Sequence, residues 1–199
     1  MISCDGRLIG SLERLLVEKE GFDPHSVVVR EDDDFTGRRF APGSWYFHDE
    51  VLVPVANVVE ATGDTIALDL TAVEVRRLRP YLSYRYRVAD AAALGRTFIA
   101  LGTGGVGIPN LDEVATKTSD ELEMAAGENV MLGDSGRKLG HVREILINDG
   151  ELLGIVLHPS GFFSHDLLIP VRFLARSDDL ALFIDATEED LANLKPTQT

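Results

Sequence analysis

The chain has a single cysteine and few basic residues. Cys4 has no second thiol to pair with among the 199 residues, so an internal disulfide is excluded and the sequence suits a reducing compartment. Lys and Arg number 19 against 33 Asp and Glu, and the net charge of −14 repels phosphate backbones and anionic lipid headgroups. The composition therefore argues against nucleic acid as a partner.

Long hydrophobic runs are also missing. Charged residues interrupt the first part of the chain, which lacks the apolar core of a signal peptide. The most apolar stretch, residues 97–111, is 15 residues long and includes four glycines and Pro109, so it is too short to span a bilayer. With 45% hydrophobic and 26% charged residues, the chain has the composition of a folded globular protein. We expect a soluble, cytoplasmic protein without a membrane span.

An internal repeat organises what is present. The segment GRLIGSLERLLV from Gly6 aligns without gaps with GRKLGHVREILI from Gly136, at an offset of 130 residues. A second pair, VLVPVANVV from Val51 and LLIPVRFLA from Leu167, aligns at an offset of 116 residues. Two segments that recur in the same order indicate that the chain contains two related units.

The repeats divide the chain into predicted domains. We predict one domain at residues 1–82, with a long loop at 31–50, and a second domain at residues 128–199. Residues 83–127 contain the run GTGGVG and are predicted to form a Gly-rich linker with room for one short helix.

Each repeat is predicted to contain short strands and to close with a helix. Turn dipeptides at Gly6 and Gly136 open a hairpin in each repeat, and β-branched runs predict three further strands per repeat. These strands cover residues 26–29, 51–55 and 65–70 in the first repeat and 154–157, 167–171 and 180–185 in the second. Pro54 and Pro170 lack an amide donor, so their strands should lie at sheet edges. Thr71 and Thr187 each precede a carboxylate by three residues, which predicts helix N-caps.

These motifs together resemble the PRC-barrel family. They are the Asp/Ser-Gly turn, the pattern G-x-x-x-G-x-[VL]-x-x-[IL]-x-[IV], a later [IV]-P-V strand and a final T-x-x-[DE] helix. The second repeat is the closer match, and the positions that fall on the motif are Gly136, Gly140, Val142, Ile145, Ile147 and Pro170. The resemblance implies a mainly β fold of two small, strongly bent barrels in tandem, similar to the cytoplasmic domain of the photosynthetic reaction-centre H subunit. It also implies docking modules rather than catalysts.

Two segments rich in aromatic and basic residues form the predicted partner surface. GRRFAPGSWYFHDE and YLSYRYR combine arginine with aromatic side chains, a composition enriched at protein interfaces. The predicted partner-binding residues are Arg38, Arg39, Phe40, Trp45, Tyr46, Phe47, Tyr81, Tyr84, Arg85 and Tyr86. Stacking of RNA bases on these aromatics is one alternative, and packing of the aromatics between barrel and linker is another.

Two patterns suggest ligands but lack the context that the ligands need. Gly102, Gly104 and Gly107 match the dinucleotide fingerprint, but Pro109 interrupts the helix that the motif requires, and TKTSDELEMAAG at 116–127 has no strand character. We therefore interpret the glycines as linker. The acidic run Glu31-Asp32-Asp33-Asp34 could attract a divalent cation, but without the spacing of a calcium loop we interpret it as a solvated loop tip.

The candidate metal ligands and nucleophile are equally sparse. His158, His165 and Asp166 would form a zinc site if a hairpin brought them together, but the first repeat does not duplicate them, and we interpret them as loop residues. Cys4 has only Arg7 as a basic neighbour, so we interpret it as an ordinary turn residue. We predict no catalytic, cofactor-binding or metal-binding residue and no cofactor.

The sequence therefore predicts a non-enzymatic PRC-barrel protein that acts as a protein-binding adaptor or scaffold. The two repeats should pair about a pseudo-twofold axis, and a homodimer is a further possibility. Two alternatives are an RNA- or ribosome-associated maturation factor acting through YLSYRYR, and a metal-dependent hydrolase using His158, His165 and Asp166.

Overall fold

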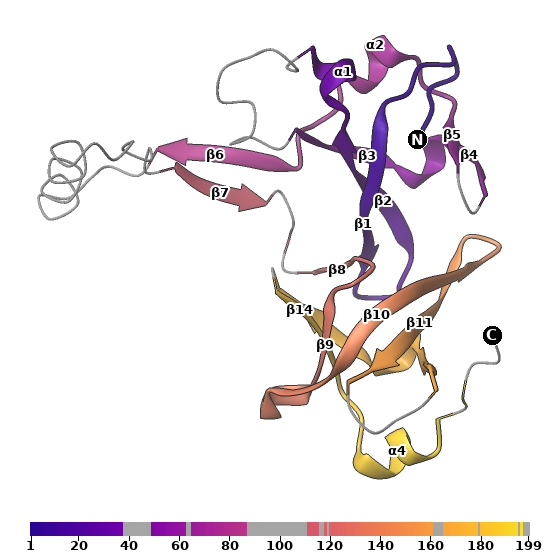
Figure 1. The fold of residues 1–199 in the computed structure, drawn as a ribbon, viewed down its shortest axis with the longest axis vertical. Helices are drawn as coiled ribbons and strands as arrows, with labels where there is room; N and C mark the ends of the chain where they lie inside the picture. The colour runs from indigo at the N-terminus through magenta and orange to yellow at the C-terminus, as the bar shows by residue number, and fades with distance from the viewer. Residues whose placement is uncertain are drawn as a thin grey trace, which may run out of the picture.

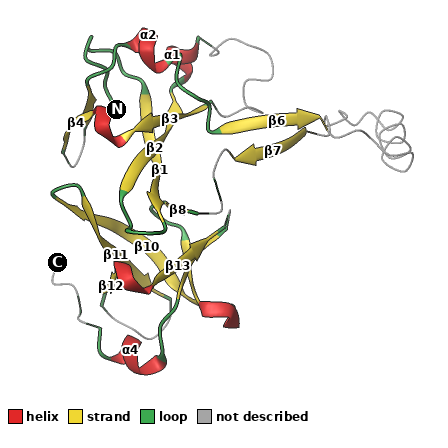
Figure 2. Cartoon of the chain, turned by 180° about the vertical axis from the view of Figure 1, so that it is seen from behind, coloured by secondary structure: helices red, strands yellow, loops and turns green. Residues whose placement is uncertain are grey.

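The protein is mainly β-sheet, as the sequence predicts. The computed structural model describes residues 1–37, 49–62, 65–86, 111–115, 118, 120–160, 165–178, 180–194 and 196. Figure 1 shows two strand-rich halves, with a hairpin projecting from the side of the upper half, and Figure 2 shows the same arrangement from behind.

The first half is built around a four-stranded sheet with the order β3-β2-β1-β8. Its strands are β1 (Gly10–Glu18), β2 (Pro24–Glu31), β3 (Glu50–Pro54) and β8 (Glu121–Met124). The other elements of this half are α1 (Asp33–Thr36), the 3-10 turn η2 (Val55–Asn57), the paired strands β4 (Val58–Ala61) and β5 (Ile66–Leu68), and α2 (Ala72–Val75).

The second half contains a six-stranded sheet with the order β12-β11-β10-β9-β14-β13, in which only β9 and β14 are parallel. Its strands are β9 (Asn129–Leu132), β10 (Arg137–Asn148), β11 (Glu151–Pro159), β12 (Leu167–Pro170), β13 (Leu174–Ser177) and β14 (Ala181–Ile184). It also has the 3-10 turns η3 (Gly133–Ser135) and η4 (Val171–Phe173) and the helix α4 (Glu188–Ala192).

The six-stranded sheet is curved but open. Its two edge strands, β12 and β13, are consecutive in the chain and are joined only by η4. A flat sheet of six strands would hold its edges about 24 Å apart. The chain from Pro170 to Leu174 spans at most about 14 Å, so the sheet must curl. No ladder joins the two edges within the described ranges, and the closed barrel that we expected is not found.

Proline and glycine occupy the positions that the repeat pattern gives them. Pro54 ends β3 and Pro170 ends β12, and both strands lie at a sheet edge, as predicted. Gly136 follows η3 with a φ of 67°, a conformation that favours glycine. A Cβ atom on Gly140 would lie 2.1 Å from the carbonyl oxygen of His158, so β10 and β11 can approach this closely only without a side chain there.

Both predicted helix N-caps are formed. The Thr71 hydroxyl accepts from the Glu74 N–H at 3.3 Å, and the Glu74 carboxylate accepts from the Thr71 N–H at 2.8 Å. Thr187 and Asp190 form the same reciprocal pair, at 3.1 and 2.9 Å. These bonds satisfy amides that the first helical turn leaves unpaired. In the described part of the chain, no helix is long and apolar enough to cross a bilayer.

The predicted linker contains more strand than its composition suggests. β6 (Leu82–Tyr86) and β7 (Leu111–Ala115) pair as antiparallel strands, and β8 adds to the edge of β1, where Leu15 lies opposite Met124. The interpretation that residues 116–127 lack strand character was therefore wrong. β8 is buried along most of its length, including the charged Glu123, and this acidic residue disguises the strand. The glycines at 102–107 lie outside the described residues.

Buried apolar side chains form one cluster that extends through both halves. The cluster includes Val17 and Val53 of the first half, Leu122 of β8, and Ile155 and Leu182 of the second half. β8 also contacts β13, so the strand that completes the first sheet also touches the second half. The division of the chain at residues 82 and 128 stays a prediction.

Candidate functional site

The predicted partner surface lies largely beyond what the structure describes. Six of its residues fall outside the described ranges: Arg38, Arg39, Phe40, Trp45, Tyr46 and Phe47. Tyr84, Arg85 and Tyr86 lie in β6, for which the structure gives only the backbone register. Tyr81 is only 2% exposed, so it is an interior residue and not the surface aromatic that we expected.

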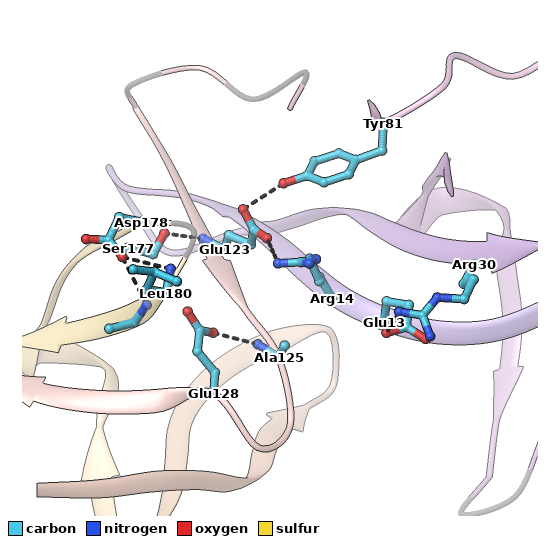
Figure 3. A network of polar contacts seen from close by, with 11 residues as sticks. Glu13, Arg14, Arg30, Tyr81, Glu123, Ala125, Glu128, Ser177, Asp178 and Leu180 are labelled. Carbon is cyan, nitrogen blue, oxygen red and sulfur yellow. Dashed lines mark hydrogen bonds and ion pairs between the residues drawn. The ribbon is translucent and has the colours of Figure 1, made fainter. Parts of the chain in front are cut away.

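Tyr81 belongs to a buried polar network at the junction of the two halves, drawn in Figure 3. Its hydroxyl donates to Oε2 of Glu123 at 2.7 Å, and Arg14 donates to the other oxygen of the same carboxylate. The Glu123 side chain is 2% exposed. Its backbone N–H donates to Oγ of Ser177 in β13 at 2.7 Å. The network therefore ties β1 and β8 of the first sheet to the second half.

The electrostatics of this network favour fixed charges. Burial acts to lower the pKa of Arg14, but the Glu123 carboxylate outweighs it and the pKa of Arg14 is raised. Burial, together with the hydrogen bond to Glu123, raises the pKa of Tyr81 far above its ordinary value. Tyr81 is therefore a neutral donor and Arg14 a permanent cation. Groups that keep one protonation state near neutral pH suit a structural tie better than acid–base catalysis.

A second polar cluster lies on β10, β11 and the start of β12. Asp166 is 8% exposed and accepts hydrogen bonds from Nδ1 of His158, at 2.7 Å, and from Arg143. His141 lies opposite His158 in the ladder, with 4.9 Å between the ring centroids. The hydrogen bond from His158 lowers the pKa of Asp166, and Arg143 lowers it further.

This cluster includes two members of the hypothesised zinc trio, but not as metal ligands. The Asp166 oxygens accept from His158 and Arg143, and His165 is exposed. Among the described residues, no group of three or more His, Cys, Asp or Glu side chains could hold a metal ion. The geometry makes Asp166 a residue that orients His158 on the sheet surface.

The acidic run of the first half begins a helix. Asp32 is the N-cap of α1, and its carboxylate accepts from the Asp34 N–H at 2.8 Å. The helix places Phe35 in the interior, where its exposed fraction is 2%. The sequence signal for this anchor was a single aromatic residue directly after a capping carboxylate, which we had interpreted only as a loop tip.

A cavity of about 300 Å³ lies between α4 and the strands β10, β11 and β12. Its apolar lining comes from Leu139, Leu157, Pro159, Leu167, Leu191 and Ala192, and its polar lining from Arg137, Lys138, Ser160 and Glu188. Arg137 and Glu188 form an ion pair of 2.7 Å, and both are exposed, so charge surrounds the mouth. This cavity was not predicted, because its walls come from segments up to 55 residues apart in the chain.

The arrangement can hold an apolar group and select for charge beside it. Leu157 is 2% exposed and forms part of the floor, whereas Lys138 is exposed at the mouth. An apolar pocket with a few charged groups at its opening is typical of a binding site for a side chain or small ligand.

Comparison with known proteins identifies the half that contains this cavity. The model of the PRC-barrel domain family matches residues 126–191, which run from the strand β9 into α4. A search of curated proteins finds no match to the chain. The second half of this protein is therefore a PRC-barrel domain, and the chain belongs to the PRC-barrel family through it, as the repeat motifs predicted.

Proposed function

We propose that this protein is a non-enzymatic adaptor that binds another protein through its PRC-barrel domain. The observation that carries the proposal is the cavity beside α4, with its apolar floor and charged mouth. Its volume of about 300 Å³ suits one large side chain, and protein interfaces often depend on a few such anchors seated in pockets.

The polar clusters support binding rather than catalysis. A general acid or base works best with a pKa near the operating pH. The pKa of Asp166 is instead lowered, away from neutrality, by His158 and Arg143. Glu123 is committed to Arg14 and Tyr81 inside the protein. These carboxylates are therefore better suited to holding the fold than to transferring protons.

We further propose that the first half is a diverged copy of the same domain. The ladder of β1 and β2 shifts register between Leu12 and Arg14, and the ladder of β10 and β11 shifts between Val142 and Glu144, at the repeat offset of 130. A second shift, after Leu16 and after Leu146, repeats at the same offset.

The ends of the two halves also correspond. Ile2 bridges Ala67 in parallel, as β9 pairs with β14, and the two capping boxes recur at the offset of 116. Bulges are local departures from a regular ladder, so two unrelated sheets have no reason to share them at a constant offset. This agreement supports a tandem arrangement with a pseudo-twofold relation between the copies.

Affinity capture with cross-linking tests the adaptor proposal. Tagged full-length protein, incubated in an extract of its native cells, should retain at least one protein that rebinds after both are purified. A variant with a blocked cavity, Ala192→Trp, and a distant surface control, Lys19→Glu, show whether retention depends on the cavity. Retention of RNA or a small molecule with no protein would overturn the proposal.

A further inference from the structure

We propose that the cavity of the PRC-barrel domain binds a phenylalanine side chain that follows acidic residues in a partner protein. This inference rests on the proposed protein-binding function and specifies its ligand. The chain carries its own example of the interaction in the first half, where the corresponding position is filled by Phe35.

The two positions correspond residue by residue. Five cavity residues, Arg137, Leu139, Leu157, Leu167 and Leu191, occupy the repeat positions of Arg7, Ile9, Val29, Val51 and Val75. Phe35 belongs to the same buried cluster as the four apolar residues of the latter set. The exit of the chain from the sheet also agrees. The Asp32 N–H donates to the Ile9 oxygen at 2.8 Å, and the Ser160 N–H donates to the Leu139 oxygen at 2.7 Å.

Two arginines hold Phe35 in the first half. The guanidinium of Arg7 lies 5.6 Å from the centroid of the Phe35 ring, and that of Arg76 lies 4.7 Å from it. Arg76 also donates to the Phe35 carbonyl oxygen at 2.5 Å. Because α1 and α2 meet through these contacts, the aromatic ring is covered on its outer side, at the upper end of Figure 1.

The second half keeps part of this arrangement and leaves it open. Arg137 takes the place of Arg7, but Ala192 takes the place of Arg76, so the side chain that covers Phe35 has no equivalent beside the cavity. Lys138 replaces the exposed Leu8, which makes the mouth more basic than its counterpart. The result is a space of about 300 Å³ with the walls of an aromatic site.

The charge at the mouth specifies what precedes the aromatic residue. In the first half, Phe35 follows Asp33 and Asp34. Lys138 and Arg137 provide positive charge beside the cavity on a chain whose net charge is −14, so an acidic segment is admitted here more readily than elsewhere on the surface. The ligand class is therefore a short acidic segment ending in phenylalanine.

A labelled peptide with the sequence of residues 31–37, EDDDFTG, is the probe for this site. Fluorescence anisotropy with the full-length protein should detect binding, and replacing the peptide phenylalanine by alanine should weaken it about 10- to 100-fold. Lys138→Glu should weaken binding about 5-fold, whereas the control Lys19→Glu should leave it unchanged. Ala192→Trp should abolish binding.

A gain of affinity guards against variants that merely misfold. Ala192→Arg recreates the residue that covers Phe35 and should tighten binding of EDDDFTG about 2- to 5-fold. Binding that is indifferent to the peptide phenylalanine, or to both changes at Ala192, would overturn the inference.

Two further outcomes separate the inference from the proposed function. Phe163 is the sequence equivalent of Phe35 at the offset of 128 that relates β2 to β11. If only a Phe163→Ala variant binds the peptide, the chain fills its own cavity and the inference fails. If captured proteins are retained equally by Ala192→Trp, the adaptor proposal stands on another surface and only the inference falls.

Discussion

Removing the positive charge from the buried junction should destabilise the protein in a pH-dependent way. Arg14→Leu leaves the Glu123 carboxylate, 2% exposed, without its cation and beside a second buried acid, Glu50. Breaking a buried ion pair by removing one partner costs about 3–5 kcal/mol, and because a third of the Arg14 side chain is exposed we expect the lower end, about 3 kcal/mol at pH 8.

The pH dependence follows from the protonation of Glu123 in the variant. A penalty of about 3 kcal/mol corresponds to a folded-state pKa about 2 units above the unfolded value of about 4.3. The folded variant then binds a proton that the unfolded chain releases, so the penalty shrinks as the pH falls. At pH 5 the loss should be about 1 kcal/mol.

Urea denaturation of the wild type and Arg14→Leu at pH 5 and pH 8 measures both values. Arg30→Leu is a matched control, because Arg30 pairs with Glu13 at 2.9 Å on the same sheet but both partners are partly exposed, and its loss should stay below about 1 kcal/mol. Adding Glu123→Gln to Arg14→Leu should remove the pH dependence attributed to this carboxylate. A loss below about 1 kcal/mol at pH 8, or an equal loss at both pH values, would refute the reasoning.

Further substitutions test the fold and its polar clusters. Phe35→Ala should lower the free energy of unfolding by about 3–5 kcal/mol, since it empties a buried aromatic site, and a change below about 1 kcal/mol in thermal or urea unfolding would contradict this packing. Gly140→Ala should cost at least about 1–3 kcal/mol because its Cβ meets the His158 carbonyl oxygen; unchanged stability would contradict the close approach. Thr187→Ala should cost about 1 kcal/mol by removing the α4 N-cap, and Thr187→Ser should restore most of it. The lowered pKa of Asp166 contributes stability above its unfolded value of about 3.9, and this is lost as the pH falls through the folded value. Unfolding of the wild type and Asp166→Asn should therefore converge in acid, and a constant difference from pH 7 to pH 2 would contradict the assignment.

Local rules determined much of this protein from the sequence alone. The capping boxes at Thr71 and Thr187, the edge positions of Pro54 and Pro170 and the turn at Gly136 depend on nearby atoms and backbone geometry, so a short stretch of sequence suffices to predict them. The repeated motifs likewise predicted the PRC-barrel domain, because its pattern of glycines and branched residues lies within one continuous segment.

Tertiary structure alone decided where the polar and aromatic residues lie. Glu123 is buried because Arg14 and Tyr81, both distant in the sequence, satisfy its charge, and β8 therefore joins a sheet that its composition does not suggest. Tyr81 is an interior residue for the same reason. The cavity beside α4 exists because three strands and a helix meet around a space that Phe35 fills in the other half. Burial and pairing are properties of contacts between distant segments, so no local pattern could have specified them.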